Sequence, residues 1–252
     1  MRAALIAFAL FAALPAALPA ALRPAAAAAE STSATLALTW APAFCETRRT
    51  RPRECAMLDG RDLPVWTGRF TLHGLWPNGG EYCGVEDRIR FLDKKGAWNR
   101  LPMPPMGKTL RTEILRAMPG ALSDLHRHEW TKHGTCHRAP GGAAEYFEDA
   151  LFALRAVNRS GIAALMRERV GGRVHVDELR AALDETYGAG AGARLQMICE
   201  REEKGERVLV REIRLSLNGK ISPYSDFGQL LHDAHPRKKG CSSGIVDAQG
   251  EQ

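Results

Sequence analysis

The chain has 252 residues, of which 45% are hydrophobic and 25% charged, and its formal net charge is +6. These values exclude an intrinsically disordered chain and leave room for one large domain with a sizeable buried core. A mildly basic charge is compatible with a polyanionic substrate but does not require one.

The N-terminus has the pattern of a secretory signal peptide. A positively charged start at residues 1–2 precedes an almost entirely apolar run at 3–22, and small residues at 25–29 offer a cleavage site. Two prolines in the apolar run argue against an uncleaved membrane anchor, and no later segment is apolar enough to span a bilayer. We therefore expect residues 1–29 to be removed and residues 30–252 to form a single secreted or periplasmic domain that is not attached to a membrane.

In chain order, this domain should begin with a strand, since residues 35–40 alternate between apolar and small polar side chains. The charged segment 46–63 is predicted to be a surface loop. Residues 68–75 alternate again and predict a second strand, which the turn residues at 77–80 bring to an end.

The second half of the chain predicts five helices and two more strands. Apolar periodicity marks the helices, the last of which Asp177 can cap, and a hairpin loop at 202–206 joins the two strands. The tail after residue 236 is predicted to be a loop. The helices are expected at 108–118, 123–134, 143–157, 162–170 and 177–187, and the strands at 193–199 and 207–217.

The cysteines add cross-links to this order of elements. An even number of cysteines in an exported chain predicts three disulfides, but six cysteines allow many pairings and their spacing alone does not choose among them. No Cys-x-x-Cys pair occurs, which argues against a zinc knuckle. Because strands and helices do not alternate as βαβ units, we expect an α+β fold, with an antiparallel sheet, several packed helices and disulfides. The cysteines are Cys45, Cys55, Cys83, Cys136, Cys199 and Cys241.

The segment His128–Cys136 gathers four titratable side chains. On a helix that turns about 100° per residue, Glu129, Lys132 and His133 all lie within about 140° of His128, and Trp130 falls on the other side as a core anchor. Such a polar face is unfavourable unless a ligand compensates its charges. A solvated helix face remains the simpler interpretation for any one of these residues taken alone.

A zinc site is an alternative interpretation of the same residues. Zinc metalloproteases use His-Glu-x-x-His, with the histidines four residues apart on one helix face. Here His128 and His133 are five residues apart, and a rotation of about 140° should point them in different directions. The sequence therefore predicts no metal ion and no other cofactor.

Paired histidines suit acid–base catalysis near neutral pH. One histidine can accept a proton while another donates one, and a lysine can neutralise the charge on a pentavalent phosphoryl group. RNA supplies its own nucleophile, the 2′-hydroxyl, so such a reaction requires neither a metal nor a serine. His73, on the predicted strand 68–75, can face the helix histidines across the phosphate.

The segments His73–Pro77 and His128–Cys136 closely resemble the paired active-site motifs of the ribonuclease T2 family, in order and separation. Trp40–Cys45 looks like the N-terminal strand of the family, and the late pair Cys199 and Cys241 also fits. The resemblance thus covers nearly the whole mature chain. It implies an exported bacterial endoribonuclease of broad base specificity, whose products are 2′,3′-cyclic phosphates and then 3′-phosphates.

The resemblance also implies a role for each matching residue. His133 resembles the general base that deprotonates the 2′-hydroxyl, and His73 the general acid that protonates the departing 5′-oxygen. Lys132 and Glu129 resemble the pair that stabilises the pentavalent transition state. His128 resembles the phosphate-binding histidine.

Base binding and disulfides follow from the same resemblance. Trp76 would stack on a base, although a core tryptophan is the alternative. Asn78 stands where many members carry an acidic residue that helps to bind the base, which leaves the base preference open, and Tyr82 is a weaker candidate for a base contact. The implied disulfides are Cys83–Cys136, which would join the two active-site segments, Cys199–Cys241 and, with these, Cys45–Cys55. Five other histidines match no family role and are interpreted as surface residues: His126, His137, His175, His232 and His235.

Two other functions stay open. A catalytically silent relative could bind RNA or another partner, although a binding module needs no matched acid and base. A zinc hydrolase would lose its activity to chelators. RNA is the expected partner, and a monomer is the expected state.

Overall fold

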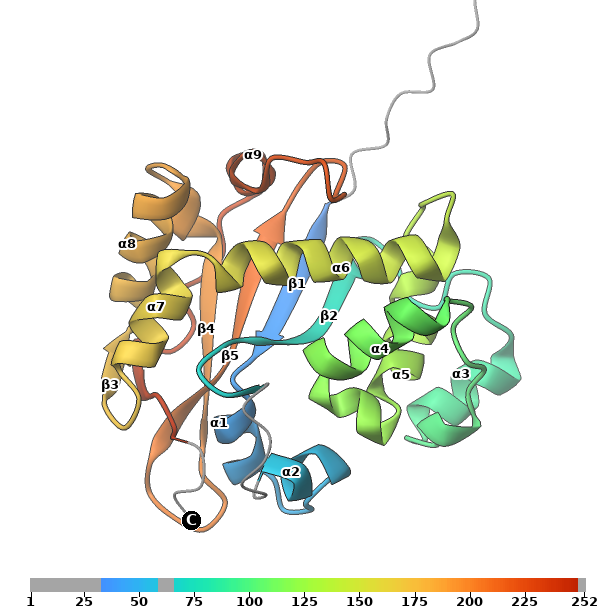
Figure 1. Cartoon of the computed structure of the whole chain (residues 1–252), viewed down its shortest axis with the longest axis horizontal. Helices are drawn as coiled ribbons and strands as arrows, with labels where there is room; N and C mark the ends of the chain where they lie inside the picture. Colours follow the sequence, from blue (N-terminus) through green and yellow to red (C-terminus); the bar gives the residue numbers. More distant parts are fainter. Residues whose placement is uncertain (1–32, 59–65, 249–252) are drawn as a thin grey trace, which may run out of the picture.

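The computed structural model describes residues 33–58 and 66–248, so the predicted signal segment 1–29 lies outside the described residues. In the described part the strands form one six-stranded sheet in the order β2-β1-β5-β6-β3, and β4 also pairs with β5 (Figure 1). The strands are β1 (Ala34–Thr39), β2 (Thr71–Pro77), β3 (Arg173–His175), β4 (Leu195–Arg201), β5 (Val208–Leu217) and β6 (Ser243–Ile245).

Helices cover one face of this sheet and both of its sides. In Figure 1, α6 runs across the strands, α7 and α8 lie at one side, and α3, α4 and α5 lie at the other. The helices are α1 (Ala41–Glu46), α2 (Arg53–Leu58), α3 (Asp87–Lys94), α4 (Lys108–Ala117), α5 (Leu125–Lys132), α6 (Gly142–Asn158), α7 (Gly161–Glu168), α8 (Val176–Tyr187) and α9 (Phe227–His232), with 3₁₀ turns η2 (Trp98–Arg100), η3 (Pro119–Ser123), η4 (Gly134–Cys136) and η5 (Ala191–Arg194).

The two faces of the sheet differ in chemistry because alternate residues of a strand point to opposite sides. Leu36 and Leu38 of β1 and Ile213 of β5 are fully buried in the same cluster as Phe147 and Leu154 of α6. The residues between them point to the other face, which therefore carries polar side chains. These are Thr35 and Thr39 of β1 and Glu212, Arg214 and Ser216 of β5.

A β-bulge interrupts the pairing of β1 with β2. Leu38 is paired with Leu72 and Ala37 with Gly74, so His73 is an extra residue that has no partner on β1. A bulge bends the strand and redirects the side chain of the extra residue. Because Leu72 points into the core beside Leu38, His73 points to the polar face of the sheet, where its Nδ1 lies 2.7 Å from Glu212 Oε2.

These features confirm the predicted α+β fold. The four strands and five helices expected from periodicity are all present, with ends shifted by at most three residues. Strands β1 and β2, β1 and β5, and β4 and β5 pair antiparallel, while β5 and β6 share a single parallel pair.

Several local predictions were wrong. Most of Trp40–Cys45 is helix α1 rather than a strand, because Pro42 lies in its first turn, where proline favours a helix start. The predicted loop 46–63 contains α2, and its last residues lie outside the described part. The helix predicted to be capped by Asp177 begins earlier, at Val176, after His175.

The elements that the sequence did not predict are short. Helices α3 and α9 have eight and six residues, and β3 and β6 have three each. Such segments give few periods of an apolar pattern, so tertiary contacts decide their conformation. In the described residues no helix is both long and apolar enough to cross a membrane.

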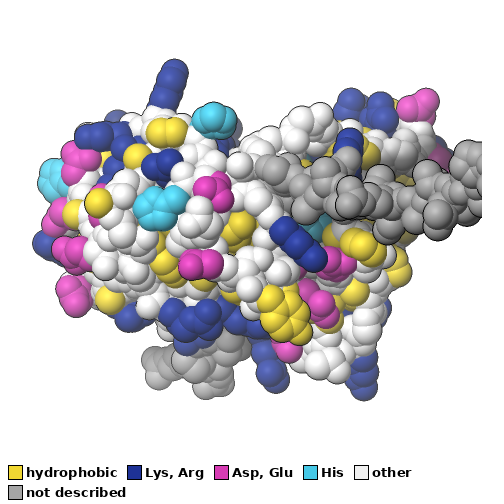
Figure 2. Space-filling model, turned by 90° about the horizontal axis from the view of Figure 1, so that it is seen from above, with side chains coloured by type: hydrophobic (Ala, Val, Ile, Leu, Met, Phe, Trp, Pro, Cys, Tyr) yellow, Lys and Arg dark blue, Asp and Glu magenta, His cyan; other side chains and the backbone are white. Residues whose placement is uncertain are grey.

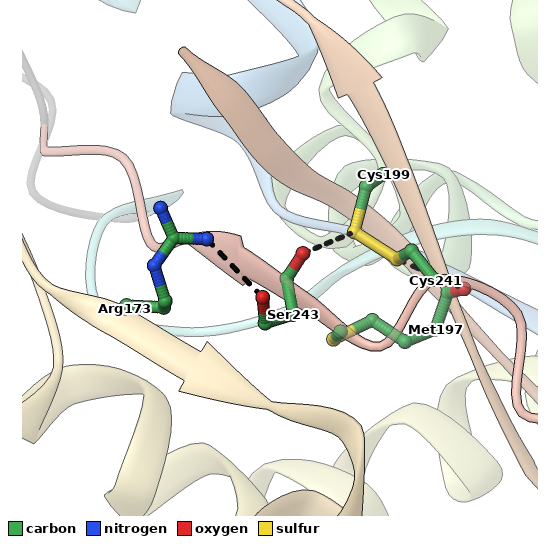
Figure 3. The surroundings of a disulfide bond; sticks show 5 residues. All are labelled: Arg173, Met197, Cys199, Cys241 and Ser243. Atoms are coloured by element: carbon green, nitrogen blue, oxygen red, sulfur yellow. Dashed lines mark hydrogen bonds between the residues drawn. A yellow bond between two sulfur atoms is a disulfide. The ribbon is translucent and has the colours of Figure 1, made fainter.

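The structure contains the three disulfides that the resemblance implies: Cys45–Cys55, Cys83–Cys136 and Cys199–Cys241. The last joins β4 to the C-terminal segment just before β6 (Figure 3). Three disulfides fit an exported protein.

Seen from above, Lys and Arg side chains intermingle with Asp and Glu and gather along the lower edge of the view (Figure 2).

Two histidines interpreted as surface residues are buried. His126 is 5% exposed, and its Nε2 lies 3.4 Å from the sulfur of Met103. His137 is 9% exposed, and its Nε2 lies 2.9 Å from Asp149 Oδ2. Each has a local partner within the fold, which the sequence pattern did not indicate.

Candidate active site

The two polar segments predicted from the sequence meet at the edge strand β2. Glu129 of α5 occupies the space next to Gly74, so that a Cβ on Gly74 would collide with the Glu129 carboxylate and the Trp76 indole nitrogen. Trp76 Nε1 donates a hydrogen bond of 2.8 Å to Glu129 Oε2. The close approach of the two segments therefore requires a glycine at position 74.

Covalent and backbone links hold the two segments together. The Cys83–Cys136 disulfide joins the loop after β2 to η4. The backbone N–H of Tyr82 donates to the carbonyl of Lys132 over 2.8 Å. These links fix the end of α5 relative to β2. They therefore also fix the position of His133 relative to His73.

His73 is placed to carry a proton. Its Nδ1 lies 2.7 Å from Glu212 Oε2, and its Nε2 lies 3.7 Å from Glu129 Oε1. Burial disfavours the protonated ring, but the hydrogen bond to Glu212 and the charges of Glu129 and Glu212 outweigh it and raise the pKa of His73 above its ordinary value. His73 therefore stays protonated over a wider pH range than a free histidine.

Glu212 is the counterpart of this effect. Its side chain is 2% exposed, and it accepts a second hydrogen bond of 2.6 Å from Arg214 Nε. Burial favours the neutral acid, but the hydrogen bonds and positive charges of His73 and Arg214 outweigh it and lower the pKa of Glu212 to about 2. Glu212 is thus a buried carboxylate that stays ionised beside His73.

His133 has the opposite environment. It caps α5 with φ −109° and ψ −48°, and its ring lies 5.4 Å from that of Trp76 and 6.3 Å from that of His128. Burial and then the charges of Lys132, His128 and His73 lower the pKa of His133 to about 3. His133 is therefore neutral near pH 7 and can accept a proton where His73 can donate one.

Glu129 lies between His73 and His128. The side chain is 1% exposed, and burial raises its pKa above the ordinary value, against the charges of His73 and His128 and the hydrogen bond from Trp76. Its Oε1 has no hydrogen-bond partner among the described residues, although it lies 3.7 Å from His73 Nε2 and 3.9 Å from His128 Nε2. A buried oxygen without a partner is costly, and it is free to interact with a substrate.

His128 is held in place by a buried acid and an aromatic ring. Its Nδ1 lies 2.7 Å from Asp93 Oδ1. The other carboxylate oxygen, Asp93 Oδ2, accepts a hydrogen bond of 2.7 Å from the hydroxyl of Tyr82. The ring of Trp98 stacks on that of His128 at a centroid distance of 4.6 Å. These contacts use Nδ1 and one ring face, so Nε2 remains directed towards Glu129.

Lys132 lies at the end of α5. Its Nζ is 3.4 Å from Glu81 Oε1, and 28% of its side chain is exposed. Its positive charge is close enough to lower the pKa of His133 and to oppose the raised pKa of Glu129. The structure thus brings His73, His128, Glu129, Lys132 and His133, all predicted from the sequence, into one site.

Comparison with known proteins identifies the family. A model of the Ribonuclease T2 family matches residues 32–226, most of the chain. The chain belongs to the ribonuclease T2 family. This result confirms the family predicted from the two motifs. Membership of this family supports endoribonuclease activity.

Two bacterial relatives of this T2 ribonuclease illustrate the similarity. The chain is 25% identical over 238 residues to Ribonuclease I of Escherichia coli, with 85% of each chain covered. It is 34% identical over 124 residues to a probable ribonuclease of Haemophilus influenzae, where the match covers 46% of this chain and 40% of that protein.

Solved structures share the fold. The crystal structure of Actibind, a T2 ribonuclease, is 16% identical and has a TM-score of 0.52, with 88% of this chain and 89% of that chain covered. The self-incompatibility-associated SF11-RNase of Nicotiana alata is also 16% identical, with a TM-score of 0.50 and coverage of 83% and 92%. At these identities the likeness shows the fold alone.

The site of this T2 ribonuclease also contains three side chains that could hold a metal ion. Ligand atoms of His128, Glu129 and His133 all lie within 4.8 Å of one another. The expectation that the two histidines point in different directions was therefore wrong. The backbone N–H of His133 still donates the helical hydrogen bond to the Glu129 carbonyl over 3.0 Å, but its φ of −109° departs from the helical value and changes the direction of its side chain. The absence of a metal in the reaction stays a prediction.

Four residues of the site were not predicted from the sequence. Glu212 and Arg214 lie on β5, Asp93 on α3 and Trp98 on η2, far in sequence from either motif. Only the alternation of β5 gives a signal, because it places the charged Glu212 and Arg214 on the same face among apolar neighbours. Asp93 and Trp98 had no sequence signal that distinguished them from surface residues.

The three predicted base contacts lie in different surroundings. Trp76 is partly exposed, and the guanidinium of Arg214 lies 5.0 Å from its ring centroid. Asn78 is exposed and close to Thr35, whose hydroxyl donates to its side-chain oxygen over 3.4 Å. Tyr82 is only 8% exposed, and its hydroxyl is engaged by Asp93. Tyr82 thus offers little surface to a base, and all three contacts stay predictions.

A cavity of about 120 Å³ adjoins His73. Its lining includes His73 and Glu212, as well as the aromatic side chains of Phe44 and Trp98. Aromatic walls can stack on any nucleobase. The cavity therefore offers a place for a base next to His73.

Proposed function

We propose that this protein cleaves single-stranded RNA at many sequences by transphosphorylation, without a metal ion. Family membership supports endoribonuclease activity. The observation that carries the mechanism is the opposite shift of two histidines in one site: the pKa of His73 is raised and that of His133 is lowered to about 3. Titratable groups whose environments push their pKa values apart are an acid and a base.

In the proposed first step, neutral His133 accepts the proton of the 2′-hydroxyl. The 2′-oxygen attacks the phosphorus and forms a new P–O bond, while the P–O5′ bond breaks. Protonated His73 donates its proton to the departing 5′-oxygen. The products are a 2′,3′-cyclic phosphate and a 5′-hydroxyl, and the two histidines have exchanged protonation states.

The second step reverses these roles with water as the nucleophile. His73, now neutral, accepts a proton from the water that attacks the cyclic phosphate. His133, now protonated, donates to the 2′-oxygen as the P–O2′ bond breaks. A 3′-phosphate results, and both histidines return to their starting states.

The other residues stabilise the pentavalent phosphoryl group. We assign Lys132 to the neutralisation of its charge and His128, oriented by Asp93, to the binding of a phosphate oxygen through Nε2. Glu129 Oε1 lies between the Nε2 atoms of His73 and His128 and can orient both. Preorganised groups of this kind stabilise charge that develops only in the transition state.

Base binding and cellular location belong to the same proposal. Trp76 and Asn78 are the proposed base contacts, and Tyr82 would contribute mainly through Asp93. Residues 1–29 would direct export to the periplasm or the medium, and residues 30–252 would act as one monomeric catalytic domain. The three disulfides support an oxidising location.

The test is digestion of RNA in excess EDTA, with identification of the product ends. We expect 2′,3′-cyclic phosphate ends, and we expect their loss in His73→Ala but not in the control His175→Ala, since His175 is exposed and lies on β3, at the opposite edge of the sheet from β2. Inactivity of the folded, disulfide-bonded wild type would favour a silent RNA-binding relative. Activity that EDTA abolishes would favour the zinc hydrolase.

A further inference from the structure

Arg237 is a partly buried cation without an acidic partner. Its Nη1 donates to Thr35 Oγ1 over 2.9 Å and to Ser216 Oγ over 3.3 Å, and neither hydroxyl carries a charge. Within residues 33–58 and 66–248, no carboxylate forms an ion pair with this guanidinium. Arginines removed from water are ordinarily paired with an acidic side chain. Arg237 has no such acidic partner among the described residues.

A second guanidinium lies close to the first. Burial and then the positive charge of Arg214 lower the pKa of Arg237. Arg214 is itself anchored to Glu212, and its guanidinium lies over the Trp76 ring. Two cations held together in a place of reduced solvent access repel each other until an anion joins them.

The strand register places these cations beside the active site. Thr35 pairs with Trp76 of β2 on one side and with Ser216 of β5 on the other. Arg214 and Glu212 precede Ser216 by two and four residues on the same face of β5. At about 3.3 Å per residue, the anchor of Arg237 lies about 13 Å along this face from Glu212, the partner of His73.

We propose that Arg237, with Arg214 beside it, binds a phosphodiester group of the RNA next to the one that is cleaved. An RNA strand whose scissile phosphate lies at His73 would pass Trp76 and bring a flanking phosphate to the two guanidinium groups. Arg237 Nη1 is the atom that the hydroxyls engage, so its other N–H groups can form the parallel hydrogen bonds that suit phosphate oxygens. This subsite rests on the proposed function, since it extends the same RNA path.

The test compares two substrates that share one cleavable bond. One is a dinucleoside monophosphate, which has no flanking phosphate. The other is an oligodeoxynucleotide that contains the same step as its single ribonucleotide, so that it is cut at one place only. The ratio of kcat/KM for the long substrate to that for the short one isolates the flanking contacts.

The variants are Arg237→Gln, Arg237→Lys and the control Arg173→Gln. Arg173 is a matched control because it also donates to a serine hydroxyl, Ser243 Oγ at 3.1 Å, but on β3 at the far edge of the sheet (Figure 3). We expect Arg237→Gln to lower the ratio about tenfold and to reduce the slope of log kcat/KM against log salt by about one. Arg237→Lys should retain most of the ratio, and Arg173→Gln all of it.

An unchanged ratio in Arg237→Gln, or an equal decrease in Arg173→Gln, would overturn the subsite. Binding of a fully deoxy oligonucleotide, measured by fluorescence anisotropy, tests it independently of catalysis, because this strand has no 2′-hydroxyl. Weaker binding by Arg237→Gln alone supports the subsite even if the wild type cleaves no RNA, a result that would reject the proposed function instead. Equal binding by the wild type and Arg237→Gln rejects the subsite.

Discussion

Replacement of Glu212 by glutamine tests the reasoning about His73 most directly. Glutamine keeps the size and an acceptor oxygen but removes the charge. The change should therefore lower the pKa of His73, because the Glu212 charge and hydrogen bond are what outweigh the effect of burial. Since His73 must be protonated to act as the acid, the alkaline limb of the activity profile should move to lower pH, while the rate at pH 5 should decrease less than the rate at pH 8.

The stability effect can be worked from the acid itself. The pKa of Glu212 is lowered from 4.5 to about 2, which corresponds to about 3 kcal/mol of stability at pH 7. Because the folded-state pKa is the lower one, this stability is present above pH 4.5 and is lost as the pH falls through about 2. We therefore expect Glu212→Gln to lower the free energy of unfolding by about 3 kcal/mol at pH 7 and by about half that at pH 3.

Urea unfolding at pH 7 and pH 3 and a pH–rate profile are the measurements. Glu200→Gln is the control. Glu200 lies on the neighbouring strand β4 and forms an ion pair of 2.9 Å with Arg211, but its side chain is 41% exposed. This exposure limits the contribution of the ion pair to the free energy of unfolding to at most about 1 kcal/mol. An alkaline limb that stays at the wild-type pH would refute the role of Glu212. So would a loss of stability that is the same at both pH values.

Three further predictions address other parts of the site. Lys132→Ala should decrease kcat by about 100-fold with a smaller effect on KM, as steady-state kinetics would show, because charge develops in the transition state; a change in KM alone would contradict this. Gly74→Ala should decrease kcat at least tenfold and lower the free energy of unfolding by about 1–3 kcal/mol, because the added methyl group displaces Glu129. Gly107→Ala is the control in the kinetic and the unfolding measurements, since a Cβ on Gly107 meets nothing within 4 Å. Dialysis against EDTA should leave the rate of RNA cleavage unchanged, whereas restoration of a lost rate by added zinc would show that His128, Glu129 and His133 form a metal centre.

Local patterns in the sequence were sufficient for the main elements and for the five central site residues. Apolar periodicity predicted the long helices and paired strands, because burial of one face is the same requirement in any fold of this class. The motifs predicted His73, His128, Glu129, Lys132 and His133, since both lie within short continuous segments. Short elements such as α3 and β6 were missed, because their stability comes from what they pack against.

The helix-wheel argument failed at one residue, for a physical reason. It assumed helical dihedral angles at His133, but this residue is the C-cap of α5 with φ −109°, and a 3₁₀ turn follows at Gly134–Cys136. The ring of His133 therefore lies 6.3 Å from that of His128 instead of pointing away. Helix ends depend on the contacts of the next segment, which here include the disulfide at Cys136.

The sequence by itself determined the chemical groups of the site and the class of the fold, because residue identity and spacing along one segment are local properties. Only the tertiary structure decided that the pKa of His73 is raised and that of His133 lowered, the difference on which the proposed acid and base roles rest. The ionised Glu212 comes from β5, 139 residues after His73, and the folded sheet brings its Oε2 within 2.7 Å of His73 Nδ1 on the polar face. A pKa depends on the charges and burial around a group, and these are set by segments that the chain brings together only when it folds.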